Sequence, residues 1–349
     1  MAMSEFEREV HTQPAAFASM LAAYGGTDSP LRRLDPILAG GPRSVMFIGM
    51  GSSLYASIPA AYMLSLRGLP AHAVDAAEYL YYRLDRPRDA FLPVLVSQSG
   101  ESPEIRRIVD GWKDTVPYVA ITNDERSALA SSAAAVLPLL AGAEASTTNK
   151  TYTNALGVTI LLSARLGGLD VASALASFAP LPEAMTALLH DWRKIVEPLA
   201  DFLCEPPHVD LVGRGPSLAS VRQGALILRE LAHIRTAGHT GGGFRHGLIP
   251  SMKRGGEMIA FAPAGVTDRL MLGLVEDVVA MGGKVVLVTN RPVEEGSRLK
   301  VWRLPELPGV AELHMPVLEI LLVELLGIVF AERRGVVPGE GIPKITPKE

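Results

Sequence analysis

Short apolar runs alternate with longer amphipathic stretches along most of the chain. Three runs in the first half end in glycine or small polar residues: "SVMFIGMG" at 44–51, "VLVSQSG" at 94–100 and "YVAITN" at 118–123. The intervals between them carry helix-like sequence, and this alternation is typical of parallel βαβ units. We therefore expect a parallel sheet flanked by helices in this half.

The second half repeats the pattern after a proline-rich junction at Pro206 and Pro207. Apolar runs begin again at 209 with "VDLVGRGPS", at 258 with "MIAFAPAG" and at 284 with "KVVLVTN". The offset between matching runs is roughly 165 residues, about the size of one domain. We predict two similar α/β domains, each a parallel sheet between helices in a flavodoxin-like three-layer arrangement. The first spans 35–170, the second spans 195–335, and residues 1–34 form a leading helix.

The composition and net charge of the chain exclude some classes of binding partner. It has 349 residues, 48% of them hydrophobic, and a formal net charge of −4 with a pI near 6.1. This balance offers no basic surface for nucleic acid or an anionic membrane, so an anionic ligand must be bound locally. The apolar stretch 317–330 carries Glu319 and Glu324, which indicates a core helix rather than a membrane span.

The cysteine content and the N-terminus suggest a cytoplasmic protein. Cys204 is the single cysteine, so no internal disulfide can form, and no histidine or cysteine cluster has the spacing of zinc ligands. The first residues mix charges and lack the apolar core of a secretory signal. We expect neither a metal nor a cofactor.

Two polar turns follow apolar runs and predict an anion site. In an open parallel sheet, ligands bind where the strands end. The sequence Ser102-Pro103-Glu104 is a strong helix-start signal, so the "SQSG" turn lies at a helix N-terminus, where free backbone N–H groups favour an anion. The "GMGSS" turn repeats the arrangement. Together they suit a phosphate monoester, and the candidate residues are Gly51, Ser52, Ser53, Ser97, Gln98, Ser99 and Ser102.

These turns are compatible with other interpretations. The serines could simply cap helices and satisfy loop backbone. The stretch "GMGSSL" offers two glycines of a dinucleotide fingerprint but has Leu54 where the third belongs, which disfavours an oxidoreductase. A phosphate-binding Walker loop is absent, and the G-x-S-x-G nucleophile elbow is incomplete.

Several motifs together resemble a known family. The stretches "FIGMGSSLYAS", "VSQSGES" and "AITND", followed by "AGAEASTTNKTYTNAL" and "GALILRELAHIRTAGHTGGGFRHG", occur in the order seen in the sugar isomerase (SIS) domain family. The arrangement is similar to the tandem-SIS isomerase half of glucosamine-fructose-6-phosphate aminotransferase. The resemblance extends over most of the chain.

This resemblance implies roles for further residues. Glu230 matches the glutamate proposed to move a proton between C1 and C2, and His246 matches the ring-opening histidine. Lys344 matches a lysine that opens the sugar through a Schiff base, in a C-terminal tail at 336–349 that covers the active site. Ser146 and Thr148 fall in the motif that completes the phosphate grip. In the family the histidine reaches the neighbouring subunit's site, which implies a homodimer.

Departures from the family pattern bear on the reaction. Ile227 stands where the synthase has a second active-site lysine, Gly243 stands where it has glutamate, and no glutaminase-like segment is expected. The resemblance then implies a phosphosugar isomerase for an amino-sugar or fructosamine 6-phosphate, with aldose/ketose isomerisation and deamination of the glucosamine 6-phosphate/fructose 6-phosphate type. The alternatives are a fructosamine 6-phosphate deglycase and a non-catalytic sugar-phosphate sensor.

Overall fold

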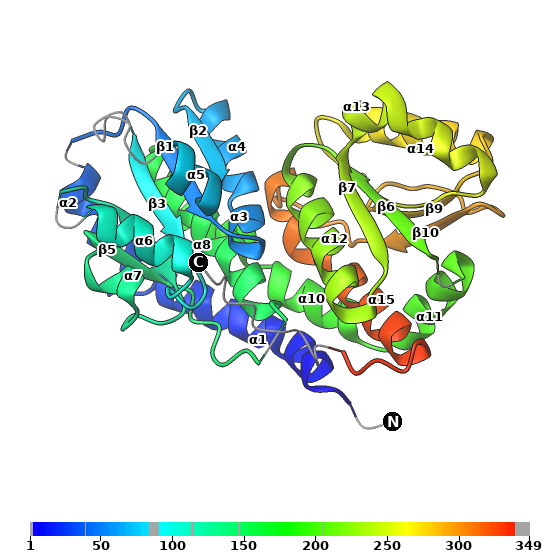
Figure 1. Ribbon diagram of the computed structural model, residues 1–349, viewed down its shortest axis with the longest axis horizontal. Helices are drawn as coiled ribbons and strands as arrows, with labels where there is room; N and C mark the ends of the chain where they lie inside the picture. The colour runs from blue at the N-terminus through cyan, green and yellow to red at the C-terminus, as the bar shows by residue number, and fades with distance from the viewer. Residues whose placement is uncertain are drawn as a thin grey trace. The chain divides into compact units, whose positions relative to one another are not determined.

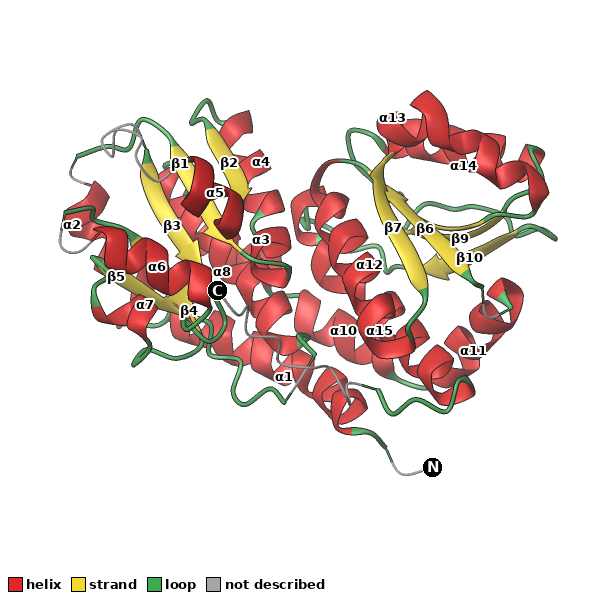
Figure 2. Cartoon of the chain, in the orientation of Figure 1, coloured by secondary structure: helices red, strands yellow, loops and turns green. Residues whose placement is uncertain are grey.

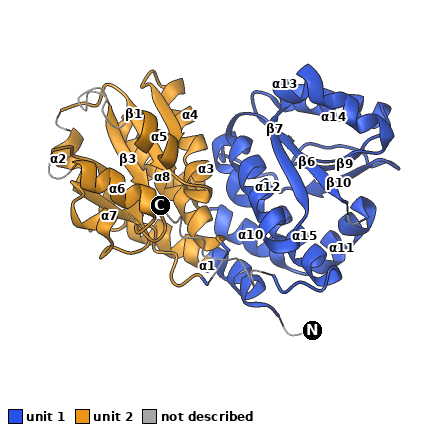
Figure 3. Cartoon of the chain, in the orientation of Figure 1, with its two compact units in different colours: residues 1–14, 145–147, 180–342 blue, residues 15–144, 148–179, 343–349 orange. Residues whose placement is uncertain are grey.

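The computed structural model describes residues 3–38, 40–83, 91–112, 115–145, 147–204 and 206–338. The chain folds into two compact units, coloured separately in Figure 3. Unit 2 contains residues 15–144 and 148–179. Unit 1 contains most of the remaining described chain, from Pro180 onward, together with the residues before Ala15.

Unit 2 is built on a five-stranded parallel sheet in the order β2-β1-β3-β4-β5. This is the flavodoxin-like order, in which the chain direction along the sheet reverses beside the first strand. In register, Val45 of β1 pairs with Ala71 of β2 and with Leu92 of β3. The strands are β1 (Val45–Gly49), β2 (Ala71–Asp75), β3 (Leu92–Val96), β4 (Val119–Thr122) and β5 (Ala135–Pro138).

Helices lie on both faces of this sheet (Figure 2). On one face, Tyr79, Trp112 and Tyr118 form a buried aromatic group with edge-on or tilted ring contacts. The amphipathic helix α6 supplies Trp112 and buries Ile105 and Ile108 against the strands. The helices of unit 2 are α2 (Asp35–Leu38), α3 (Ser52–Ala56), α4 (Ile58–Leu66), α5 (Ala76–Tyr82), α6 (Pro103–Trp112), α7 (Ala128–Ser131), α8 (Lys150–Leu166), α9 (Val171–Phe178) and the 3₁₀ helix η1 (Pro30–Leu34).

Unit 1 repeats the same topology. Its sheet has the order β10-β9-β8-β6-β7. Read from β7 and counted within the unit, this is the order of unit 2. Figure 1 labels β6, β7, β9 and β10 of this sheet. The strands are β6 (His208–Gly213), β7 (Arg235–Thr240), β8 (Glu257–Phe261), β9 (Lys284–Thr289) and β10 (Leu299–Arg303). Its helical segments are α10 (Leu181–Leu189), α11 (Trp192–Leu203), η3 (Gly215–Ser217), α12 (Leu218–Ala232), α13 (Gly241–Gly243), η4 (Phe244–Leu248), η5 (Ile249–Arg254), α14 (Asp268–Ala280), η6 (Glu312–His314) and α15 (Pro316–Arg333). The prediction of two similar α/β domains with parallel sheets is confirmed.

The leading helix and the apolar C-terminal helix both form as predicted. Helix α1 (Glu5–Gly25) buries Phe17 and Met20, and its first residues belong to unit 1 while the rest belong to unit 2. Two helical stretches, Val171–Leu189 and Glu312–Arg333, are long and apolar enough to cross a membrane by composition. The second is 94% buried inside the protein, as expected of a core helix. Its two glutamates accept hydrogen bonds from side chains of unit 1.

The predicted domain limits each enclose one sheet. Strands β1–β5 lie within 35–170, and strands β6–β10 lie within 195–335. Most of the predicted C-terminal tail, 336–349, lies outside the described residues.

Candidate functional site

The two polar turns lie side by side at one edge of the unit 2 sheet. Strands β1 and β3 are neighbours and parallel, with Gly49 opposite Val96, so both end at the same edge. Gly51 precedes α3 with φ +48°, and Gly100 has φ +64° in the turn after β3. A Cβ at Gly100 would lie 2.1 Å from the hydroxyl of Ser127, so this turn requires glycine.

A small cavity opens where these turns meet. Its volume is about 100 Å³, and it is lined by Met50, Ser52, Ser53, Gln98, Leu139, Thr148, Thr151, Tyr152 and Ala155. Four of these residues were predicted from the sequence: Ser52, Ser53, Gln98 and Thr148. In the part of the chain that the structure describes, no residue forms a hydrogen bond with the hydroxyls of Ser52, Ser53 and Thr148. The same holds for the side-chain amide of Gln98. The structure therefore gathers available donors around one small space.

The other serines of the turn are engaged within the turn itself. The hydroxyl of Ser97 accepts from the N–H of Gly100 at 3.1 Å and lies 3.2 Å from the hydroxyl of Ser102. The exposed Ser99 accepts from the N–H of Glu101 at 3.2 Å. None of the three lines the cavity, and the hydrogen bonds of Ser97 and Ser99 to backbone N–H groups leave their hydroxyl hydrogens free to donate. Helix α6 begins at Pro103, as the sequence predicts.

The start of helix α8 closes the cavity from a distant part of the sequence. The carboxylate of Glu144 accepts from the N–H groups of Asn149 and Thr151, both at 3.0 Å, and from the hydroxyl of Thr151 at 2.5 Å. These bonds fix the first turn of α8, which presents Thr151 and Tyr152 to the cavity. The sequence interpretation missed these two residues, although the "NKTYTN" run has the helix-start composition that could have marked them.

The residues with proposed proton-transfer roles belong to unit 1. Glu230 lies on α12 and is partly buried, and this burial raises the pKa of its carboxyl group from 4.5 to about 7. His246 is exposed, in the segment η4. Ile227 is fully buried, whereas Gly243 is exposed. Ser146 and Lys344 lie outside the described residues.

The corresponding edge of the unit 1 sheet is filled by the protein's own carboxylates. Glu319 is fully buried and accepts from the hydroxyls of Ser217 at 2.7 Å and Ser220 at 2.5 Å. Glu312 accepts from the N–H of Val266 at 3.0 Å. Burial raises the pKa of both glutamates, that of Glu319 to about 7. Internal groups thus satisfy donors after β6 and β8, whereas the matching turns of unit 2 leave their donors open.

Metal binding has no visible basis in the described part of the chain. Within it, no group of three or more histidine, cysteine, aspartate or glutamate side chains is placed to hold a metal ion.

A flavodoxin-like sheet with hydroxyl-lined turns at its carboxyl edge defines a class of α/β proteins that bind anionic groups. The sequence profile of the SIS domain matches residues 41–163 and 202–320, one copy in each half of the chain. The chain therefore belongs to the SIS domain family, in a tandem arrangement. The predicted fold class and family resemblance are confirmed.

Known relatives cover nearly the whole chain. It is 28% identical over 334 residues to the isomerizing glutamine–fructose-6-phosphate aminotransferase of Methanothermobacter thermautotrophicus, covering 95% of this chain and 55% of the relative. The chain thus spans about half the length of the curated relatives it matches. Among solved structures, the C-terminal domain of glucosamine-fructose-6-phosphate aminotransferase from Francisella tularensis is 21% identical with a TM-score of 0.84, covering 96% of this chain and 97% of that one. Glucosamine-6-phosphate deaminase from Thermotoga maritima is 18% identical with a TM-score of 0.72, covering 99% and 98%. Likeness to these two structures establishes the fold alone.

Proposed function

We propose that the protein is a phosphosugar isomerase that acts on an amino-sugar or fructosamine 6-phosphate. It would interconvert aldose and ketose phosphates and release the amino group, as in the conversion of glucosamine 6-phosphate to fructose 6-phosphate. The cavity in unit 2 carries this proposal. Its volume of about 100 Å³ is far below the roughly 300–1,000 Å³ of pockets that enclose whole small molecules. It suits the phosphate end of a sugar phosphate.

The chemistry of the cavity supports a phosphate rather than an apolar group. A phosphate ester presents three acceptor oxygens, which need several convergent donors. Ser52, Ser53, Gln98 and Thr148 provide hydroxyl and amide donors that no described residue occupies. The matching turn of unit 1 differs, because its hydroxyls donate hydrogen bonds to the fully buried carboxylate of Glu319.

Glu230 is proposed as the group that moves a proton between C1 and C2. A general base works best when its pKa lies near the working pH, because it must be ionised and still hold a proton firmly. Burial raises the pKa of Glu230 to about 7, which meets this requirement near neutral pH. By family resemblance, His246 would open the sugar ring and Lys344 would form a Schiff base. The same resemblance suggests a homodimer in which His246 serves the neighbouring subunit. The cysteine content suggests a cytoplasmic location.

The test is a substrate panel that reads two products at once. The full chain is incubated with glucosamine 6-phosphate, fructose 6-phosphate and fructosamine 6-phosphates, and ammonia release is measured together with aldose/ketose exchange. We expect exchange and ammonia release with glucosamine 6-phosphate. Turnover of fructosamine phosphates alone would identify a deglycase. Thermal stabilisation by a sugar phosphate without turnover would identify a sensor.

Paired serine variants test the cavity itself. Ser53→Ala removes a hydroxyl that lines it, whereas Ser131→Ala removes an exposed hydroxyl that bonds only within helix α7. A hydrogen bond to a charged group contributes about 1.5–3 kcal/mol, so Ser53→Ala should weaken sugar-phosphate binding about 10- to 100-fold. Ser131→Ala should leave binding unchanged. Equal affinity in both variants would exclude the cavity as the phosphate site.

A further inference from the structure

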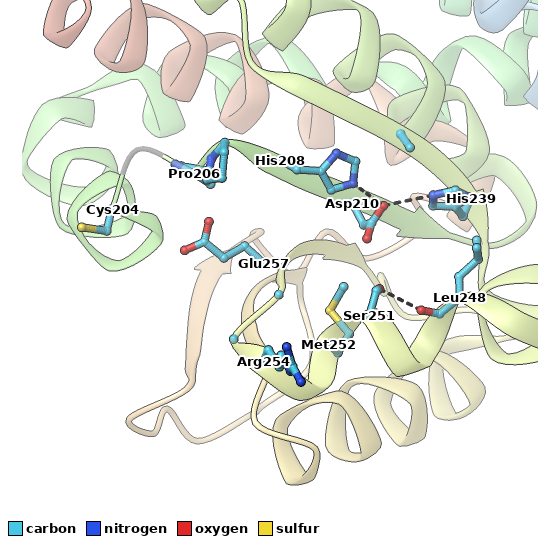
Figure 4. Close-up of a pocket in the computed structure, with 14 residues that line it drawn as sticks. Cys204, Pro206, His208, Asp210, His239, Leu248, Ser251, Met252, Arg254 and Glu257 are labelled. Atoms are coloured by element: carbon cyan, nitrogen blue, oxygen red, sulfur yellow. Dashed lines mark hydrogen bonds and ion pairs between the residues drawn. The ribbon is translucent and has the colours of Figure 1, made fainter.

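Unit 1 contains a second and larger cavity, shown in Figure 4. Its volume is about 550 Å³, within the range of sites that hold whole small molecules. It lies over the first residues of β6 and β8 and against segment η5, and not at the carboxyl edge where the glycine turns are found. The side chains that matter for its chemistry are His208, Asp210, His239, Ser251, Arg254 and Glu257.

Two histidines of this cavity share one carboxylate oxygen. The Nε2 atoms of His208 and His239 lie 2.9 Å and 3.1 Å from Oδ1 of Asp210 (Figure 4). An ionised carboxylate only accepts, so both rings must carry a hydrogen on Nε2. The strand register explains the arrangement: His208 and Asp210 are two residues apart on β6 and share a face, and His239 comes from the neighbouring strand β7.

The second oxygen of Asp210 has no hydrogen-bond partner among the described residues. The Asp210 residue is only 5% exposed, and no described residue donates to Oδ2, which points from the imidazoles into the cavity in Figure 4. The ion-pair contacts of this carboxylate within the described chain are those with the two histidines, and none is with a lysine or an arginine. A carboxylate whose first oxygen accepts from two imidazole N–H groups can still accept a charge-assisted hydrogen bond from a cationic donor at its second oxygen.

The other polar side chains that line the cavity do not neutralise the charge of Asp210. Glu257 has its own cation, since Lys284 Nζ lies 3.6 Å from its carboxylate, and burial raises the pKa of Glu257 to about 7. The hydroxyl of Ser251 donates to the carbonyl of Leu248. Arg254 is exposed and lies in the last turn of η5.

We propose that this cavity binds a small molecule that carries an ammonium group, and that the ammonium docks on Oδ2 of Asp210. The two histidines orient the carboxylate and keep it from turning away. The site lies entirely within unit 1, whereas the candidate phosphate cavity lies in unit 2.

Titration of the full chain with matched probes tests the proposal. The ammonium probes are ethanolamine and glucosamine, and the neutral counterparts of similar shape are ethylene glycol and glucose. The readout is the NMR signals of the His208 and His239 rings at about pH 7, where both amine probes carry mostly an ammonium group. Both ammonium probes should shift these signals with saturation, and the neutral probes should not. No shift with the ammonium probes, or equal shifts with the neutral ones, would overturn the proposal.

Three variants locate the binding. Asp210→Asn keeps the shape but removes the charge, and should weaken ethanolamine binding at least about tenfold. Asp201→Asn, at an exposed aspartate of the same unit, should not affect it. Ser53→Ala should also leave it intact, so a failed phosphate site and a failed ammonium site are distinguishable. Retained affinity in Asp210→Asn would refute the assignment, and the probe comparison on the unaltered chain decides the matter if that variant does not fold.

Discussion

Ionisation of Glu230 should set the pH dependence of turnover. A base works in its ionised form, so the rate should rise with pH through the pKa of the group and then level off. With a pKa of about 7, roughly one-tenth of Glu230 is ionised at pH 6 and one-hundredth at pH 5. We therefore expect kcat/KM for aldose/ketose exchange to fall tenfold for each pH unit below neutrality. A glutamate at the ordinary value of 4.5 would leave the rate nearly flat down to about pH 5.

The assay must separate the enzyme from its substrate, because a phosphate monoester titrates near pH 6. Substrate binding is therefore measured over the same pH range by thermal stabilisation of Glu230→Gln, which removes the base and retains the cavity. That variant should bind sugar phosphate as the parent does and show no exchange. Where the pH dependence of kcat/KM follows that of substrate binding, the change would be due to ionisation of the substrate phosphate. Full activity of Glu230→Gln, or a rate profile flat from pH 5 to 8, would refute the role of Glu230.

Three further predictions concern stability and assembly. Burial raises the pKa of Glu319 above its value in the unfolded chain, so the folded state binds the proton more tightly. The free energy of unfolding should therefore fall by up to about 3 kcal/mol as the pH rises from 4.5 to about 7. Urea titrations should find no such pH dependence in Glu319→Gln. Gly100→Ala should lower the thermal unfolding temperature more than Gly68→Ala does. Both glycines have positive φ, but only at Gly100 would the added Cβ collide with a neighbour, Ser127. Equal decreases in the two variants would contradict this steric argument. Sedimentation under assay conditions should show a dimer, and a monomer alone would argue against a shared site at His246.

The strands that the sequence revealed are those in the middle of each sheet. Apolar runs predicted β1, β3 and β4 in one half and β6, β8 and β9 in the other, and all six are present. Four strands were not predicted: β2, β5, β7 and β10. Each lies at an edge of its sheet. An edge strand has one strand neighbour and is less enclosed, so it needs no continuous apolar run, as "RTAGHT" of β7 illustrates.

Sequence reasoning named four residues that line the cavity but could not separate the serines that line it from those that do not. Ser53 and Ser97 follow adjacent strands and carry the same hydroxyl, yet only Ser53 lines the cavity, while Ser97 bonds within its turn. Turn formation and phosphate binding select the same short hydroxyl side chains, so composition cannot separate them. Thr151 and Tyr152 reach the cavity from the first turn of α8. The "NKTYTN" run marks a helix start, but it does not indicate which sheet edge that start approaches.

The two copies of the fold diverge at the same structural position. In unit 2 the turns after the first and third strands of the sheet end in donors that no described residue takes up. In unit 1 the equivalent edge holds Glu319 beneath the turn after β6 and Glu312 beside the turn after β8. A carboxyl group of the chain thus occupies the kind of position that suits a phosphate, and its hydrogen bonds already use the hydroxyls of Ser217 and Ser220. The hydroxyls after β6 are therefore already bound within unit 1, whereas those of Ser52 and Ser53 after β1 have no partner among the described residues.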